Sequence, residues 1–308
     1  MKTLVFDGHN ALWRLQKRLP ELSVSGKPVQ VVFGFMRLLR AALAQFEPDA
    51  AVVCFDSGFP EARVKIYPGY KHGRHHDPDE ESSLTQQLKV IKQILPSINV
   101  VHLSFPNTEA DDLVAITCHD LSGEKIIVSS DRDMFHLVRK NVSVWSPIKY
   151  DLYTEENFRK LTGMSPRQWL EFRVLTGDSG DGIPGVARGF GEETAKELIE
   201  KYGSIEELFL PKVEKRVSRK GNRYALLYSD GVRESVKRNF LLMDLTLPQK
   251  GENYPKISKM LEKRMARRRT VDRVTLRETF EEQKFKTLLK DFARWVRPFE
   301  DLDTVEEK

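Results

Sequence analysis

Short, mostly apolar runs alternate with amphipathic stretches through the first half of the chain. The apolar runs lie at 3–6, 50–55, 99–103, 125–128 and 142–145. Runs of this length that are rich in β-branched residues are typical of buried strands. Apolar residues recur at helical spacing in the stretches between them, notably 29–46, 82–95 and 111–121. Strands that alternate with helices predict an α/β protein whose central sheet is mostly parallel and is covered by helices on both faces.

The second half of the chain predicts helices rather than strands. Residues 167–175, 192–202 and 275–296 show helical periodicity, and a Gly-rich segment separates the first two stretches. We therefore expect two regions, an α/β core over 1–175 and a helical region over 176–308. The acidic tail after Pro298 is expected to fray, as chain ends commonly do.

Charge is distributed unevenly over the 308 residues. Residues 211–308 contain 25 Lys and Arg against 16 Asp and Glu, a net charge of +9, whereas residues 1–210 contain 25 against 29, a net charge of −4. A basic region of this size is an electrostatic footprint for nucleic acid, although solvated helix faces can also be basic.

No apolar run reaches membrane-spanning length, so no membrane contact is expected. The cysteines, Cys54 and Cys118, lie in apolar surroundings and indicate a reduced, cytoplasmic protein.

Acids follow the predicted strands and open one predicted helix. Because the carboxyl ends of parallel strands meet at one edge of a sheet, acids that follow several strands are expected to lie close together. Carboxylates held close together repel one another unless a cation lies between them, and oxygen ligands suit Mg²⁺ or Mn²⁺. A solvated acidic turn is the alternative for any single acid. The acids concerned are Asp7, Asp56, Glu109, Asp111, Asp112, Asp131 and Asp133.

A Gly-rich segment with two further acids, Asp178 and Asp181, follows residues 167–175. It continues through 182–191 into the predicted helix 192–202. Backbone N–H groups in such turns and at helix N-termini bind phosphate without reading sequence. The segment lacks the Gly-Lys-Ser/Thr of a Walker A loop, so it predicts a duplex-binding hairpin rather than a nucleotide site.

A distinct segment spans 60–96, in which a basic loop with aromatic residues precedes the predicted helix 82–95. Lys71 and Arg74 lie close to Tyr67 and Tyr70, a combination that suits a single nucleic-acid strand. A zinc site is a less favoured alternative, because the histidines have no second cluster of ligands. These histidines are His72, His75 and His76.

The chain resembles the metal-dependent 5′ nucleases: flap endonucleases, the 5′-nuclease domain of bacterial DNA polymerase I and phage 5′ exonucleases. The resemblance covers about residues 1–209, and its motifs occur in the order found in that family. The matching motifs are Phe6-Asp7-Gly8, Val53-Cys54-Phe55-Asp56, Tyr67-Pro68-Gly69-Tyr70-Lys71-His72-Gly73-Arg74, Glu109-Ala110-Asp111-Asp112, Ser130-Asp131-Arg132-Asp133 and Gly177-Asp178-Ser179-Gly180-Asp181.

The resemblance implies a PIN-like nuclease core, a helical arch over about 63–95 and a helix–three-turn–helix element over 177–202. It implies two Mg²⁺ or Mn²⁺ ions held by nine acids, and it places Lys71 and Arg74 at the scissile phosphate with Tyr70 near the terminal nucleotide. Glu193 departs from the family, which often has a Lys there. The nine acids are Asp7, Asp56, Glu109, Asp111, Asp112, Asp131, Asp133, Asp178 and Asp181. The expected DNA contacts are Arg63, Lys65, Gly185, Arg188, Gly189, Gly191, Lys196, Lys215, Arg216, Arg219 and Lys220.

The expected function is therefore that of a structure-specific 5′ nuclease in replication or repair. Its substrates would be DNA with a 5′ flap, a nick or a free 5′ end, and also RNA–DNA hybrids. A K⁺ ion at the hairpin turn, a monomeric state, replication proteins as partners and a phage-encoded origin are further expectations. Two alternatives stay open: a DNA-structure-binding protein without turnover, and a metal-dependent phosphatase acting on small esters.

Overall fold

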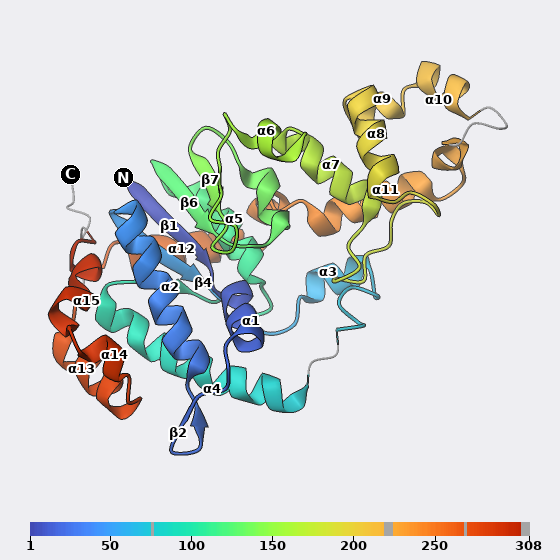
Figure 1. Ribbon diagram of the computed structural model, residues 1–308. Helices are drawn as coiled ribbons and strands as arrows, with labels where there is room; N and C mark the ends of the chain where they lie inside the picture. Colours follow the sequence, from blue (N-terminus) through green and yellow to red (C-terminus); the bar gives the residue numbers. More distant parts are fainter. Residues whose placement is uncertain (75–76, 219–223, 268–269, 303–308) are drawn as a thin grey trace.

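The computed structural model describes residues 1–74, 77–218, 224–267 and 270–302, and its centre is a six-stranded sheet (Figure 1). The strand order is β5-β4-β1-β6-β7-β8. The first five of these strands run parallel, and only the edge strand β8 is antiparallel. This topology confirms the predicted α/β class. The bounds are β1 Lys2–Asp7, β4 Ala50–Cys54, β5 Val101–Leu103, β6 Glu124–Val128, β7 Val142–Trp145 and β8 Leu152–Tyr153.

Helices cover both faces of the sheet (Figure 1). Side chains of a strand point alternately to the two faces, so Leu4 and Phe6 of β1 pack into one apolar cluster and Val5 packs into the other. The first cluster contains residues of α2, α4, α13, α14 and α15, and the second contains residues of α5, α7, α8, α11 and α12. The bounds are α2 Gln30–Phe46, α4 Pro78–Ile94, α5 Ala110–Asp120, α7 Pro166–Thr176, α8 Glu192–Tyr202, α11 Val232–Met243 and α12 Tyr254–Met265.

The last helical stretch differs from the expectation of one helix over 275–296. It forms three helices, α13 Arg273–Glu282, α14 Lys286–Leu289 and α15 Phe292–Glu300. Lys284 has a φ of 53° and breaks the first helix, and the Asp291 side chain caps the third. The apolar side chains keep a roughly helical period across these breaks, which is why the pattern alone suggests one helix.

These three helices return to the α/β core. The Arg40 Nε of α2 donates to the Trp295 carbonyl oxygen at 2.9 Å, and Phe299 and Leu302 are buried. The expected fraying after Pro298 is therefore wrong as far as residue 302, because α15 continues through Pro298 and packs its apolar side chains on the core. Residues 303–308 lie outside the described residues.

Two helical pairs flank the carboxyl end of the sheet. The helix α3 Glu61–Ile66 and helix α4 belong to the segment expected to form the arch, about 63–95, and α4 begins at Pro78 because Asp77 caps it. Helices α7 and α8 enclose the Gly-rich hairpin, and α8 has the expected bounds. The small helices α9 Ile205–Leu208 and α10 Pro211–Val217 extend outward beyond α8 (Figure 1).

The remaining elements are the helices α1 Gly8–Arg18 and α6 Phe158–Thr162 and the two-stranded ribbon of β2 Ser23–Val24 and β3 Lys27–Pro28. Short 3₁₀ turns lie at Leu95–Ile98, Arg132–Leu137, Ala225–Tyr228 and Leu247–Lys250. None of the helices in the described ranges is both long enough and apolar enough to span a membrane.

Candidate active site

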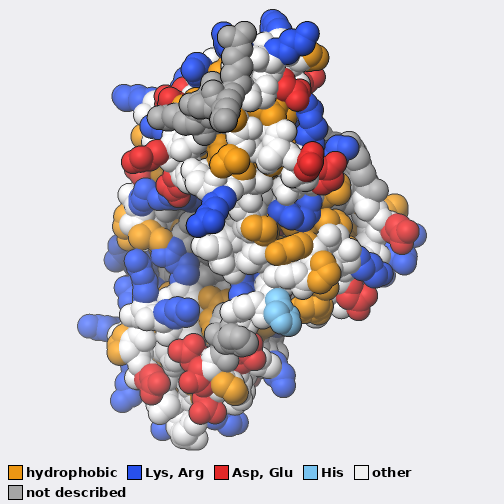
Figure 2. All heavy atoms as spheres, turned by 90° about the vertical axis from the view of Figure 1, so that its right-hand side faces the viewer, with side chains coloured by type: hydrophobic (Ala, Val, Ile, Leu, Met, Phe, Trp, Pro, Cys, Tyr) orange, Lys and Arg blue, Asp and Glu red, His pale blue; other side chains and the backbone are white. Residues whose placement is uncertain are grey.

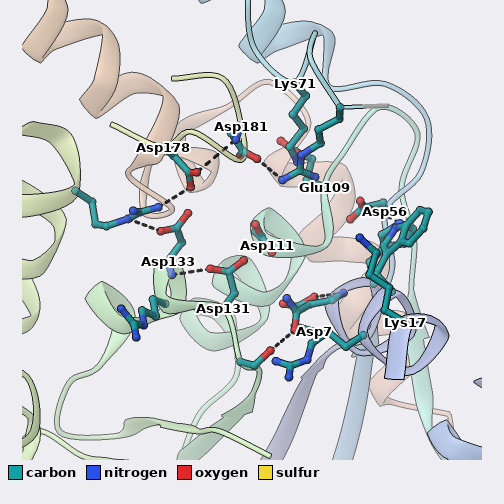
Figure 3. Close-up of a pocket in the computed structure, with 18 of the residues that line it drawn as sticks. Asp7, Lys17, Asp56, Lys71, Glu109, Asp111, Asp131, Asp133, Asp178 and Asp181 are labelled. Carbon is teal, nitrogen blue, oxygen red and sulfur yellow. Dashed lines mark hydrogen bonds and ion pairs between the residues drawn. The ribbon is translucent and has the colours of Figure 1, made fainter. Parts of the chain in front are cut away.

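A cavity of about 730 Å³ opens at the carboxyl end of the parallel strands (Figure 3). Carboxylates from five separate segments of the chain line it, and they approach it from the ends of β1, β4 and β6, from the start of α5 and from the hairpin after α7. The structure thus brings together eight of the nine predicted acids. These are Asp7, Asp56, Glu109, Asp111, Asp131, Asp133, Asp178 and Asp181.

Local backbone geometry explains why these carboxylates face the cavity. Asp7 ends β1 and caps α1, since its Oδ1 accepts from the Asn10 N–H at 3.1 Å. Asp131 caps the turn after β6 by accepting from the Asp133 N–H at 2.8 Å. A side chain that caps a helix must point across the helix N-terminus, and both of these capping carboxylates line the cavity.

Several of these acids carry mutual repulsion that their protein neighbours do not offset. Burial, and then the charge of Asp131, raises the pKa of Asp7 to about 7. The same two causes raise the pKa of Asp133 to about 7 although Arg173 opposes them. Burial, followed by Asp7 and Asp131, raises the pKa of Asp111 well above its usual value. Bound divalent cations would relieve this repulsion, and a donor set made only of carboxylates suits hard cations such as Mg²⁺.

The side chains as placed do not yet enclose an ion. Within the described residues, no three His, Cys, Asp or Glu side chains converge closely enough to hold a metal. Protein cations hold several of the acids instead: Arg173 contacts Asp133 at 2.9 Å and Asp178 at 2.5 Å. The donor set fits a metal site, and small side-chain movements would be needed for the acids to surround an ion.

The predicted cations of the arch lie directly above the acids. Lys71 Nζ pairs with Glu109, and Arg74 pairs with Asp181 and also donates from Nε to the Gly180 carbonyl oxygen at 3.0 Å. The Lys71 N–H donates to the Asp181 carbonyl oxygen at 2.8 Å. The turn that carries Lys71 and the hairpin turn that carries Asp181 are therefore joined to each other at the cavity (Figure 3).

Two unusual backbone positions make this close approach possible. Lys71 has a φ of 56°, a left-handed conformation that costs roughly 1 kcal/mol for a residue with a Cβ. Gly182 has a φ of 69°, and a Cβ there would lie 2.8 Å from the Gly69 carbonyl oxygen. Only a glycine allows the hairpin backbone to pass so near the arch backbone.

Tyr70 is placed differently from what the resemblance implies. Its ring is buried, and its hydroxyl lies 3.1 Å from both carboxylate oxygens of Glu109. Arg63 and Lys71 lie over its ring, at 5.9 and 5.2 Å from the ring centre. In this arrangement Tyr70 supports the Glu109 carboxylate, and its ring presents no open face to a nucleotide.

Asp112 and Arg63 also differ from expectation. Asp112 does not line the cavity, because both of its oxygens bind the Arg63 guanidinium, at 2.6 and 2.8 Å. Arg63 is expected to contact DNA, yet its side chain is only 11% exposed and points inward. The expected assignments of Asp112 as a metal ligand and Arg63 as a DNA contact therefore do not match where these side chains lie.

One wall of the cavity, which α1 provides, is not predicted from the sequence. Its residues occupy two rows at helical spacing, so the signal is the i, i+4, i+8 pattern directly after Asp7. Lys17 lies at the cavity edge in Figure 3. The α1 residues that line the cavity are His9, Asn10, Trp13, Arg14, Lys17 and Arg18, and outside α1 Ser130, Arg132 and Arg173 are missed as well.

The expected duplex contacts within the described residues lie outside the cavity lining. Lys65 is exposed on α3, Lys215 and Arg216 are exposed on α10, and Lys196 on α8 lies 3.9 Å from Glu200. In the hairpin before α8, Arg188, Gly189 and Gly191 are exposed and Gly185 is half-buried. Figure 2 shows Lys and Arg side chains beside a hollow at mid-height of this face, with a group of acidic side chains below. Two of the expected DNA contacts, Arg219 and Lys220, lie outside the described residues. The same holds for His75 and His76, so the zinc alternative stays a prediction. The K⁺ ion at the hairpin turn also stays a prediction.

The parallel sheet, the carboxylate-lined cavity at its carboxyl end and the cations above it define an α/β protein with a candidate metal site. Comparison with known proteins gives the family. Residues 2–163 match the 5′-3′ exonuclease N-terminal resolvase-like domain, and residues 164–231 match the 5′-3′ exonuclease C-terminal SAM fold. The chain belongs to the 5′-3′ exonuclease family, which confirms the resemblance.

Individual relatives agree with this assignment. A 5′-3′ exonuclease of Aquifex aeolicus is 37% identical over 213 residues, which are 68% of this chain and 72% of that protein. The thermostable DNA polymerase I of Thermus aquaticus is 33% identical over 303 residues, or 96% of this chain, and the chain spans 34% of that polymerase's length. A bacteriophage T5 flap endonuclease, solved as a pseudo-enzyme-product complex with DNA and metal ions, has the same fold. Its TM-score is 0.67 at 20% identity, over 85% of this chain and 98% of that one.

Proposed function

We propose that this chain is a structure-specific 5′ nuclease, with both 5′-3′ exonuclease and flap endonuclease action, that hydrolyses phosphodiester bonds in DNA. The substrates are duplexes with a 5′ flap, a nick or a free 5′ end, and RNA–DNA hybrids. The observation that carries the proposal is the cavity in which eight carboxylates lie beneath the cations of the arch. The T5 flap endonuclease of similar fold, which was solved with DNA and metal ions, supports it.

The acids that line the cavity would hold two divalent ions, Mg²⁺ or Mn²⁺. The inner group of these acids consists of Asp7, Asp111 and Asp131. Within this group, Asp131 raises the pKa of both Asp7 and Asp111, and Asp7 also raises the pKa of Asp111. When bound, such ions supply an activated water and neutralise charge on the phosphate and the leaving oxygen. The acids of this chain hold and orient those ions, and no side-chain nucleophile is required.

Lys71 and Arg74 would bind the scissile phosphate. In the structure they pair with Glu109 and Asp181, so both must exchange a carboxylate for a phosphate oxygen when DNA enters. Lys71 then acts as a compact positive charge, and Arg74 offers a planar fork to two oxygens. Because both side chains start within the cavity, the exchange requires rotamer changes rather than refolding of the arch.

The duplex would be held by phosphate contacts alone. Exposed backbone in the hairpin and the N-terminus of α8 offer N–H groups to one strand, and the exposed cations of α10 add charge. On the other side of the acids, Arg14, Lys17 and Arg18 of α1 offer cations to the strand beside the scissile bond. Phosphate contacts carry no sequence information, so the enzyme would select DNA by shape.

Product mapping tests this function. Flap, nicked-duplex and RNA–DNA substrates labelled at the 5′ end are incubated with Mg²⁺, with Ca²⁺ or with EDTA. We expect short 5′ products only with Mg²⁺ or Mn²⁺. Tight binding without any product would favour a non-catalytic DNA-structure-binding protein. Hydrolysis of a chromogenic phosphate ester that DNA does not inhibit would favour a phosphatase.

We expect the protein to act as a monomer in the cytoplasm, beside replication proteins. The cell would be a bacterium or a cell infected by a phage. Sedimentation of the protein with and without flap DNA tests the monomeric state. A sedimentation coefficient that rises with protein concentration would contradict it.

A further inference from the structure

Arg63 connects three elements around the cavity. It belongs to α3 at the start of the arch, and its Nη1 and Nη2 contact Glu109 and Asp112 at the start of α5. Its Nε donates to the Leu242 carbonyl oxygen of α11 at 3.1 Å. A guanidinium has five N–H donors in a rigid fork, so it can hold several acceptors in fixed relative positions.

The two acids that Arg63 holds face different places. Glu109 lines the cavity and is also contacted by Lys71 and the Tyr70 hydroxyl. Asp112 is absent from the cavity lining and uses both oxygens on Arg63. Arg63 therefore neutralises the charge of Asp112 with both oxygens bound, whereas it binds only Oε2 of Glu109, and Oε1 pairs with Lys71 at the cavity.

We propose that Arg63 is a positioning residue that holds the Glu109 carboxylate toward the cavity, with Asp112 as its counter-charge rather than as a metal ligand. This inference rests on the proposed metal site. When Lys71 leaves Glu109 for a phosphate, Arg63 remains and keeps that carboxylate charged and oriented. Arg63 also ties the base of the arch to the first turn of α5, so the arch and the metal site keep one relative position.

The adjacent pair Asp111 and Asp112 offers a matched test. Each is changed to Asn, and Mn²⁺ binding is measured by paramagnetic resonance on the full chain without DNA. We expect Asp111→Asn to weaken Mn²⁺ binding at least tenfold, because it removes an acid that lines the cavity. Asp112→Asn should weaken it much less, and circular dichroism in EDTA shows that both variants are folded.

Arg63→Lys tests the positioning role itself. Lysine keeps the charge but cannot reach Glu109, Asp112 and the Leu242 carbonyl oxygen together. Loss of an outer partner of a metal ligand typically costs roughly 10- to 100-fold in metal affinity, and we expect Mn²⁺ binding to fall within that range. The Mg²⁺ concentration for half-maximal single-turnover cleavage should rise in parallel, a change that a purely structural role would not cause.

A double variant keeps the test informative if Arg63→Lys folds poorly. Arg63→Met with Asp112→Asn removes both charges together, a replacement that folded proteins often tolerate. If Asp112 acts only through Arg63, Asp112→Asn should have no further effect on Mn²⁺ affinity in the Arg63→Met background.

Three outcomes separate the claims. Equal losses of Mn²⁺ affinity in Asp111→Asn and Asp112→Asn would overturn the assignment of Asp112. Wild-type Mn²⁺ affinity in folded Arg63→Lys would overturn the positioning role and leave the proposed function intact. Failure of the wild-type protein to bind Mn²⁺ would overturn the metal site and this inference with it.

Discussion

Replacing Asp7 by Asn should stabilise the metal-free protein at neutral and alkaline pH. Asp7 is fully buried at the end of β1, and burial together with Asp131 raises its pKa from 3.8 to about 7. Asn keeps an oxygen that can accept from the Asn10 N–H, so the cap of α1 survives the change. The variant therefore removes a repelling charge and keeps this cap. It also replaces one Asp7 oxygen, and Oδ2 accepts from the Ser129 hydroxyl at 2.8 Å, which reduces the expected gain.

The sign and size follow from proton linkage. Since the folded-state pKa lies above the unfolded one, the unfolded chain loses this proton first, and stability falls as pH rises from about 4 to about 7. The difference, 7 − 3.8, is about 3 pH units and corresponds to about 4 kcal/mol. Asp111 and Asp131 share the repulsion, so we expect a gain of about 2 to 4 kcal/mol in the free energy of unfolding at pH 8.

Urea unfolding in EDTA at pH 5, 6.5 and 8 measures this gain for wild type and Asp7→Asn. The gain should shrink toward acidic pH, and added Mg²⁺ should reverse it, because the ion stabilises only a protein that binds it. Asp230→Asn, at an exposed acid outside the cavity, is the control and should show neither effect. Parallel pH profiles for wild type and Asp7→Asn would refute the claim that the acids repel one another.

Three further predictions concern DNA. Lys71→Ala should lower the single-turnover rate more than it weakens duplex binding, because its charge matters most as charge develops on the phosphate; equal losses would make Lys71 an ordinary clamp. Glu193→Lys should tighten duplex binding severalfold at low salt in Ca²⁺, because charges about 6 Å apart interact by roughly 3 kcal/mol before screening; superimposed salt titrations would show that Glu193 faces away from DNA. Neutralising Lys215 and Arg216 together should weaken binding to all duplex sequences alike. The slope of the logarithm of the binding constant against the logarithm of the salt concentration should flatten by about 0.9 per lost phosphate contact. An unchanged slope would exclude both residues from the interface.

The sequence predicts the acid cluster because the relevant geometry is simple. Asp7, Asp56 and Asp131 follow buried strands, and parallel strands necessarily bring their carboxyl ends to one edge. The order of the strands is not needed for that argument, and it is also not available from the pattern of apolar residues.

The sequence cannot separate Asp111 from Asp112 in the same way. Neighbours on a helix point about 100° apart, so one of two adjacent acids can face a cavity while the other points away from it. Which one does so depends on how α5 is rotated against the sheet, and that rotation is set by the apolar packing of α5 on β1, β4 and α12. The role of Arg63 is hidden for a related reason, since its partners lie 46, 49 and 179 residues away along the chain.

Cleavage of a 5′-flap DNA by wild type and Asp131→Asn tests the central claim most directly. Both proteins are first shown to bind the labelled flap equally in Ca²⁺, and each is then given Mg²⁺ in a single-turnover reaction. The account predicts cleavage near the flap junction by wild type and a rate lower by several orders of magnitude in Asp131→Asn, because this acid lies at the centre of the carboxylate group. Wild-type cleavage by Asp131→Asn at limiting Mg²⁺, or cleavage that persists in EDTA, would contradict it.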